Sequence, residues 1–103
     1  MVKSSLFQRK VWRKTKSIPR GRVITYAVLA RAVGKPRAAR AVGNALHSNP
    51  YRTTPCHRVV LSDGRVGGYL GGIHKKIDVL KNEGVEIFRG RVKPRYILSR
   101  LSR

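Results

Sequence analysis

One cysteine in this chain has neighbours that favour chemistry at its sulfur. Cys56 lies directly between Pro55 and His57, in the run Pro-Cys-His-Arg-Val-Val that ends at Val60. A thiol becomes a nucleophile when positive charge or a base favours its thiolate over the resting pKa of about 8.5. Taken alone, a lone cysteine is more often a small buried hydrophobic side chain. The sequence therefore predicts covalent chemistry at Cys56, with a packing role as the alternative.

Several other chemistries fit these residues poorly. A single cysteine forms no internal disulfide, so the thiol stays available and a reducing compartment is expected. The cysteine and the three histidines lack the paired spacing of a zinc site, so we expect no metal. The glycine-rich run 67–72 lacks the Lys-Ser/Thr ending of a phosphate-binding loop. A cysteine hydrolase would need a substrate cleft that a small arginine-rich domain hardly provides.

The charge of the chain predicts a polyanionic partner. The formal net charge is +20, and residues 1–62 hold fourteen Lys or Arg and no carboxylate. The basic residues are spread over turns and helices without the aromatic amphipathic face of a membrane-surface helix, so nucleic acid is favoured over a membrane. High solubility alone is the alternative. Because no continuous apolar run is present, we expect a soluble intracellular protein.

Three helices are predicted in the first half of the chain. Ser5 followed by Gln8 resembles a capping box before an apolar stripe, which begins the first helix. Thr25 can cap a second helix that closes at Gly34, and a third helix is expected directly after Pro36. The last two helices, joined by a tight turn, have the outline of a DNA-binding helix-turn-helix. Many helical hairpins with arginine on the solvent-exposed face bind no ligand, so this outline alone does not decide whether the segment binds DNA.

The second half predicts a hairpin, a loop and a last helix. Residues 59–66 predict a short β-hairpin beside the cysteine. The glycines of 67–72 predict a loop that can wrap a planar ligand, with a flexible connector as the alternative. A last helix is expected from Ile73 to a stop at Gly84.

These elements add up to one small domain. A chain of 103 residues has room for one domain and no second one. We expect a mainly α fold over residues 1–103, a winged-helix-like helix-turn-helix domain with the hairpin next to the cysteine. The basic tail from about 89 to 103 is expected to pack in part and to leave its remaining charges in water or on phosphate.

Ordered blocks of this sequence resemble one known family. They are Ala-Ala-Arg-Ala-Val-Gly-Asn-Ala at 38–45, Asn-Pro at 49–50, Pro-Cys-His-Arg-Val at 55–59 and Gly-Tyr-Leu-Gly-Gly at 68–72. Together they resemble the DNA-binding, catalytic domain of O6-alkylguanine-DNA alkyltransferases, the methylated-DNA:protein-cysteine methyltransferases. The resemblance extends from about residue 7 to residue 87.

The resemblance implies catalytic roles for four residues. Cys56 would attack the alkyl carbon on guanine O6. His57 would serve as its base, through a water, with Glu83 orienting the imidazole. Tyr26 would contact the flipped-out base and help supply the proton that lets guanine leave. Taken one at a time, each side chain also has an ordinary structural reading, such as a core aromatic for Tyr26.

The resemblance also implies residues that bind DNA and the extruded base. Arg40 would fill the gap that the base leaves in the stack. Tyr69 would form a wall of the base pocket, and Asn49 would brace the recognition helix against the cysteine segment. The same substrate-binding set includes Ala39, Arg58 and Val60.

The function implied by the resemblance is direct repair of DNA. The protein would transfer an alkyl group, such as methyl, from O6-alkylguanine in double-stranded DNA to its own cysteine, once per molecule and without a cofactor. We expect a monomer that meets DNA on the minor-groove side and lacks the extra N-terminal domain of many members. Two alternatives remain, a non-catalytic alkylguanine-binding protein and an architectural nucleic-acid-binding protein. Leu70 in place of a common serine, and a polar lead-in at 51–54, depart from the family pattern.

Overall fold

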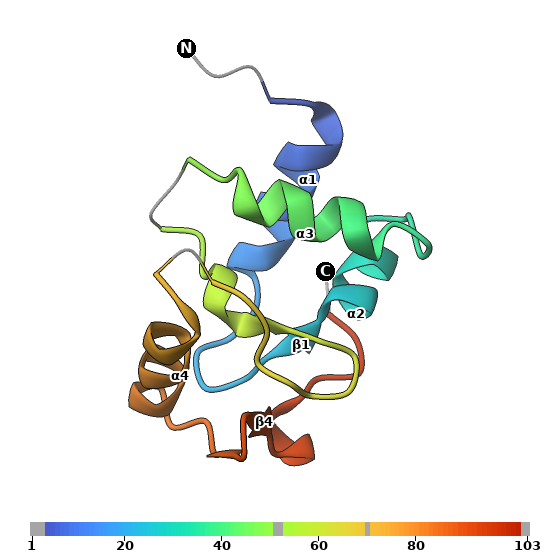
Figure 1. Ribbon diagram of the computed structural model, residues 1–103. Coiled ribbons are helices and arrows are strands. Elements are labelled where there is room, and N and C mark those ends of the chain that lie inside the picture. The colour runs from blue at the N-terminus through green and yellow to red at the C-terminus, as the bar shows by residue number, and fades with distance from the viewer. Residues whose placement is uncertain (1–3, 51–52, 70, 102–103) are drawn as a thin grey trace.

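The computed structural model describes residues 4–50, 53–69 and 71–101, which form a mainly α domain with two small pairs of strands (Figure 1). This confirms the predicted fold class. The helices are α1 (Leu6–Lys16), α2 (Tyr26–Ala32), α3 (Ala39–His47) and α4 (Ile73–Asn82), with short 3-10 turns η1 (Cys56–Arg58) and η2 (Pro94–Tyr96). The strands are β1 (Ile24–Thr25), β2 (Val59–Val60), β3 (Ile87–Phe88) and β4 (Arg91–Val92). Within the described residues, no helix is long and apolar enough to cross a membrane.

Side-chain caps fix where the first two helices begin. The predicted capping box is present, because Ser5 Oγ accepts a hydrogen bond from the Gln8 N–H at 3.0 Å and Gln8 Oε1 accepts one from the Ser5 N–H at 2.8 Å. Thr25 Oγ1 accepts from the Val28 N–H at 3.1 Å and caps α2. Such caps satisfy N–H groups that have no partner inside the helix.

Helix α3 begins later than the sequence suggested. The chain was expected to become helical directly after Pro36, yet α3 starts at Ala39. The reason is a turn in the connection, where the Lys35 N–H bonds to Ala30 O and the Ala38 N–H bonds to Lys35 O, both at 2.9 Å. These bonds terminate α2 and form a turn over residues 35–38, so the next helix begins after this turn.

The strand after the cysteine corrects the predicted hairpin. Strand β2 does not pair with residues 65–66 but lies parallel to β1, with Ile24 opposite Val59 and Thr25 opposite Val60. The turn itself is present, because the Leu61 N–H bonds to the Arg65 carbonyl at 2.9 Å. Both residues of β2 are buried, and strands buried on two faces are typical of parallel pairing.

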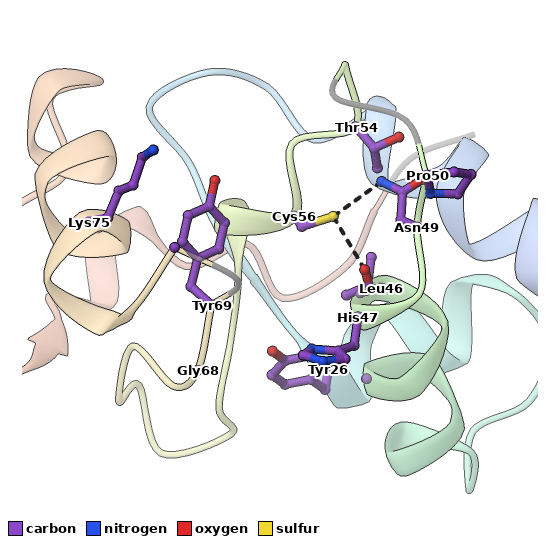
Figure 2. Close-up of a pocket in the computed structure, with 12 residues that line it drawn as sticks. Tyr26, Leu46, His47, Asn49, Pro50, Thr54, Cys56, Gly68, Tyr69 and Lys75 are labelled. Atoms are coloured by element: carbon purple, nitrogen blue, oxygen red, sulfur yellow. Dashed lines mark hydrogen bonds between the residues drawn. The ribbon is translucent and has the colours of Figure 1, made fainter.

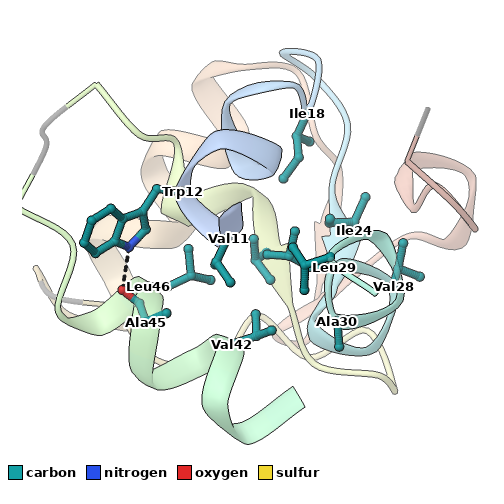
Figure 3. Close-up of a cluster of buried hydrophobic side chains, with 12 residues drawn as sticks. Val11, Trp12, Ile18, Ile24, Val28, Leu29, Ala30, Val42, Ala45 and Leu46 are labelled. Atoms are coloured by element: carbon teal, nitrogen blue, oxygen red, sulfur yellow. Dashed lines mark hydrogen bonds between the residues drawn. The ribbon is translucent and has the colours of Figure 1, made fainter. Parts of the chain in front are cut away.

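The β1–β2 pair separates two hydrophobic clusters, which we call the helical core and the C-terminal core. The helical core lies between α1, α2 and α3 and includes Ile24 and Val59 (Figure 3). Trp12 closes its edge by donating its indole N–H to Ala45 O at 2.7 Å. The C-terminal core consists of Val23, Val60, Val66, Leu80, Val85 and Val92. Val23 and Ile24, and likewise Val59 and Val60, therefore face different cores, as the alternation of side chains in extended backbone requires.

The basic tail packs in part, as expected. Val23 donates its N–H to Tyr96 O at 2.9 Å and accepts from the Leu98 N–H at 2.8 Å, which holds the segment after η2 beside β1. Val92 is buried in the C-terminal core, and Leu98 packs against the helical core. Glycine is required at Gly84, where the predicted stop of α4 has φ +90°.

Candidate active site

Cys56 opens a short turn between the two cores and faces a cavity. It is the first residue of η1, directly before β2, and it is half-buried against the helical core. The adjoining open cavity has a volume of about 740 Å³. Figure 2 shows the sulfur between Tyr69 on one side and Asn49 on the other, with Tyr26 below. The thiol is thus accessible from the cavity while its backbone is held at the junction of the fold.

Two groups from the end of α3 hold the sulfur. The Asn49 side-chain amide donates a hydrogen bond to Cys56 Sγ at 3.5 Å, and Sγ lies 3.9 Å from the Leu46 carbonyl oxygen, to which the thiol can donate. Burial raises the pKa of the Cys56 thiol, an effect that the Asn49 hydrogen bond and the charge of Lys76 partly oppose. At neutral pH the thiol therefore stays largely protonated, and its reaction needs a base.

A histidine, whose imidazole can accept a proton, follows the cysteine directly. His57 Nε2 lies 3.1 Å from Glu83 Oε2, and the Glu83 side chain is only 9% exposed. Arg58 grips the same carboxylate through two hydrogen bonds, from Nε at 3.0 Å and from Nη2 at 2.7 Å. Burial alone would raise the pKa of Glu83, but the hydrogen bonds from Arg58 and His57 hold it below its ordinary value. The carboxylate is therefore ionised and can only accept hydrogen bonds.

The ionised carboxylate determines the tautomer of His57. Because Glu83 only accepts, Nε2 carries the hydrogen and Nδ1 keeps its lone pair. Burial lowers the pKa of His57, although Glu83 opposes the shift, so the ring is neutral at pH 7. No direct hydrogen bond joins the ring to Sγ within the described residues. His57 is therefore a neutral imidazole whose Nδ1 can accept a proton, and it directly follows the protonated thiol in the chain.

Two tyrosines line the cavity from different elements. Tyr26 begins α2, and α3 comes close to it at Gly43, where an added Cβ would lie 3.8 Å from the ring. Burial raises the pKa of Tyr26, and the proximity of Cys56 adds to the shift, so its hydroxyl stays a hydrogen-bond donor. Tyr69 lies in the glycine loop, with its ring 6.5 Å from that of His57 at an interplanar angle of 86°. The glycine loop thus contributes an aromatic wall beside the base.

The remaining residues of the predicted set occupy three places. Arg40 is exposed and Ala39 is partly exposed on the first turn of α3, outside the cavity lining. Arg58 lies behind the cavity, where Nη1 also donates to Ile18 O at 2.9 Å. Val60 is fully buried in the C-terminal core, so its side chain faces away from the cavity. The structure brings Tyr26, Asn49, Cys56 and Tyr69 together around one cavity, and the hydrogen-bonded pair of His57 and Glu83 lies outside its lining.

The sequence analysis missed Lys76, whose ammonium lies inside the protein. Its side chain is 0% exposed, and Nζ donates to Val59 O at 2.7 Å and to Gly68 O at 3.2 Å. Burial lowers the pKa of Lys76 to about 8, although Cys56 partly opposes the shift. A signal was available, because position 76 falls on the apolar stripe of α4 between Ile73 and Leu80. Lys76 ties the glycine loop to β2 and places a positive charge near the thiol.

Thr54 is a second feature that the sequence analysis passed over. The residue is 6% exposed and lines the cavity, and its hydroxyl has no hydrogen-bond partner within the part of the chain that the structure describes. A polar atom in this state raises the energy of the empty site. Leu70 and residues 51–52, which belong to the two departures from the family pattern, lie outside the described residues.

Comparisons with known proteins agree with this geometry. A sequence model for the DNA-binding domain of 6-O-methylguanine DNA methyltransferase matches residues 6–85. A methylated-DNA–protein-cysteine methyltransferase of Shigella flexneri is 48% identical over 79 residues, which cover 76% of this chain and 46% of that protein. The chain thus spans about half the length of the curated relatives that it matches.

Two solved structures share the fold. Mycobacterium tuberculosis OGT, crystallised in complex with DNA, superposes with a TM-score of 0.75 at 40% identity over 81% of this chain and 52% of that chain. S. pombe Atl1, crystallised with damaged DNA containing O6-carboxymethylguanine, gives a TM-score of 0.82 at 36% identity over 95% of this chain and 99% of that chain. With the match over residues 6–85, these similarities show that the chain belongs to the 6-O-methylguanine DNA methyltransferase family.

Proposed function

We propose that this protein repairs DNA directly, by moving an alkyl group from O6 of guanine onto Sγ of Cys56. The observation that carries the proposal is the half-buried thiol on the wall of the cavity, held by Asn49 and followed by a neutral histidine on an ionised glutamate. In the reaction a bond forms between sulfur and the alkyl carbon while the bond from that carbon to O6 breaks. The thioether product is not hydrolysed at a useful rate, so each molecule acts once.

The proton balance follows from the site. Because the thiol pKa is raised, the proton must leave Sγ as the sulfur attacks, and Nδ1 of His57 is the free acceptor that takes it through a water. The electrons of the broken bond go to guanine, which gains a proton from Tyr26 as it departs. The proton held on His57 returns to Tyr26 through solvent. Overall, the thiol and the alkylguanine become a thioether and guanine.

The proposal requires that the damaged base leaves the duplex. The target atom lies inside the base stack, and extrusion costs a few kcal/mol, least for a base that pairs poorly. Arg40 projects from the exposed start of α3, where small alanines allow the helix to approach a narrow groove. We propose that α3 enters the minor groove of duplex DNA, that Arg40 fills the vacated space and that the protein acts as a monomer inside the cell.

The decisive experiment weighs the protein after incubation with a duplex that carries O6-methylguanine. We expect a gain of one methyl group on Cys56, located by peptide mapping, and no gain with the undamaged duplex. Cys56→Ala should bind the damaged duplex without gaining mass. If the wild type binds damaged DNA and stays unmodified, the protein recognises damage without repairing it. Equal binding of damaged and plain DNA without modification would instead support an architectural role.

A second experiment separates base extrusion from the chemical step. Arg40→Ala should slow alkyl transfer from duplex DNA far more than transfer from free O6-benzylguanine, since only the duplex requires extrusion. Arg13→Ala, on the exposed face of α1, removes the same charge and serves as the control. Equal slowing on both substrates would show that Arg40 does not act in extrusion.

A further inference from the structure

A strongly basic surface with an exposed aromatic ring lies far from the cavity, on the β3–β4 hairpin. Phe88 pairs with Arg91 across the hairpin, and Arg91 pairs on its other side with Arg65. Residues directly opposite one another in antiparallel strands point to the same face. Phe88, Arg91 and Arg65 therefore form one row, and with Arg89 at the turn they make up what we call the hairpin surface.

The two arginines of this row face each other directly across the strand pairing. The Val66 N–H bonds to Gly90 O at 3.0 Å and the Val92 N–H bonds to Gly64 O at 2.9 Å. These bonds flank the facing residues Arg65 and Arg91, which makes them a non-hydrogen-bonded pair, the kind whose side chains lie closer together. Like charges in this position destabilise a sheet. An anion bound between them would remove that repulsion.

The nearby carboxylates do not balance the arginines. Asp63 accepts a hydrogen bond from Arg65 Nε at 2.7 Å and also feels the charge of Arg91, so its single negative charge offsets one of the three positive charges on Arg65, Arg89 and Arg91. Glu86 is engaged elsewhere, by the Tyr96 hydroxyl and by Lys93 and Arg95. The hairpin surface therefore keeps an excess of positive charge even after its own ion pair is counted.

Phe88 and Arg89 are unusual residues for their positions in a hairpin. The wet face of a two-stranded hairpin is normally polar, yet Phe88 is 62% exposed while Val92, on the opposite face, is buried. Arg89 has φ +52° and is the sole non-glycine residue with a positive φ among those described. Asn, Asp or Gly would fit this turn position better. The Arg89 guanidinium lies 5.3 Å from the centre of the Phe88 ring, a cation–π contact that helps to hold the ring outward.

The exposed Phe88 ring, the facing arginines and the positive φ of Arg89 each lower stability, and one kind of ligand would use all of these residues. Exposed aromatic rings beside arginines bind single-stranded nucleic acid, because bases stack on the ring and phosphates pair with the guanidinium groups. A second copy of this chain is disfavoured by its net charge of +20. A fully paired duplex has no free base face to offer. We propose that the hairpin surface binds a single strand of nucleic acid, with a base stacked on Phe88 and phosphates on Arg65, Arg89 and Arg91.

The position of the hairpin makes this site separate from α3. Figure 1 shows β4 at the lower end of the domain and α3 in its upper half. A duplex on α3 and a single strand on the hairpin would therefore contact different elements. The proposal does not depend on alkyl transfer, so failure of one leaves the other standing.

The test measures binding of a short labelled oligo-dT by fluorescence anisotropy at fixed salt. Phe88→Ala should weaken binding about five-fold or more, because it removes the stacking of one base. Phe88→Tyr should retain binding, since its ring is equally flat. Phe88→Leu should bind as weakly as Phe88→Ala, because leucine is apolar but offers no π face. On a duplex of equal length all three variants should match the wild type.

Because the protein is so basic, a second control must separate the loss of charge at the hairpin surface from the loss of charge anywhere on the molecule. The double variant Arg89→Ala/Arg91→Ala should weaken oligo-dT binding more than Arg9→Ala/Arg13→Ala, which removes two exposed charges from α1. The proposal is overturned if the two double variants bind equally, or if Phe88→Ala binds oligo-dT like the wild type. It is also overturned if Phe88→Ala loses duplex binding to the same degree. Phe88-dependent binding of oligo-glutamate but not of oligo-dT would assign the surface to an acidic protein instead.

Discussion

The helical core and the C-terminal core, which lie on either side of the β1–β2 pair, contribute different parts of the site. The helical side supplies the thiol environment, because Leu46 in the last turn of α3 and Asn49 just after it contact Cys56. The C-terminal side supplies Glu83 at the end of α4 and the buried ammonium of Lys76. Cys56 and His57 are thus neighbours in sequence that receive their hydrogen-bond partners from opposite sides of the fold.

Arg58 joins the two sides. Its Nη1 bonds to Ile18 O in the helical half, while Nε and Nη2 bond to Glu83 in the other. A site divided in this way has its geometry only when both cores are folded and docked. We therefore predict that a destabilising substitution in either core lowers the rate of alkyl transfer. A substitution of His57 should lower that rate and leave the fold intact.

The largest expected effect is on the base. His57→Ala should slow alkyl transfer about 10²- to 10⁴-fold, because it removes the proton acceptor. In the wild type, transfer should fall as pH drops through the pKa of His57, which lies below the ordinary value for imidazole, and should be flat near neutral pH. Single-turnover rates against pH would measure both. Glu83→Gln, which keeps the ring but removes the charge behind it, should have an intermediate effect. A wild-type rate in His57→Ala would exclude it as the base.

The second prediction asks whether the two cores unfold together. Leu29 and Leu80 are fully buried, one in each core, and alanine at either should lower the free energy of unfolding by about 2 to 5 kcal/mol. Because the site spans both cores, we expect one transition in each variant. Trp12 reports only on the helical core, so its fluorescence can be compared with circular dichroism. If Leu80→Ala leaves the Trp12 transition unchanged, the cores are independent.

The third prediction concerns the charge buried in the C-terminal half. Below pH 8 Lys76 is charged in folded and unfolded protein, and the folded state bears the full burial penalty. Between its folded pKa of about 8 and the ordinary 10.5, the unfolded chain binds more protons, so stability rises with pH, by up to about 3 kcal/mol. Urea unfolding of wild type and Lys76→Met, at neutral pH and near pH 10, isolates this gain. Parallel pH dependence in both proteins would contradict it.

The smallest expected effect is at the cavity wall. Thr54→Val keeps the shape of the side chain and removes the unpartnered hydroxyl, so it should stabilise the protein by about 1 kcal/mol. Thr54→Ser, which retains the hydroxyl, is the control. Thermal unfolding would measure the difference. A loss of stability in Thr54→Val would show that the hydroxyl is bonded in solution, for instance to a water in the cavity.

Much of this protein was predictable from residues that interact locally. The cap at Ser5 and the stop at Gly84 depend on side chains and dihedral angles within a few residues, so their signals are visible in the sequence. The run around Cys56 likewise placed a thiol beside an imidazole before any fold was known. The family and the mainly α fold followed from such local patterns.

The tertiary structure decided what depends on distant partners. Two-residue strands carry no signal of what they pair with, so the parallel match of β1 and β2 replaced the expected hairpin. From the sequence, Lys76 would be taken for a surface lysine. In the folded protein its ammonium is buried and donates hydrogen bonds to the carbonyls of Val59 and Gly68. Burial, which shifts the pKa values of the thiol and the imidazole in opposite directions, is a property of the packed molecule. The amino-acid types fix which chemical groups are present, and packing sets which of them share a site and in which protonation state.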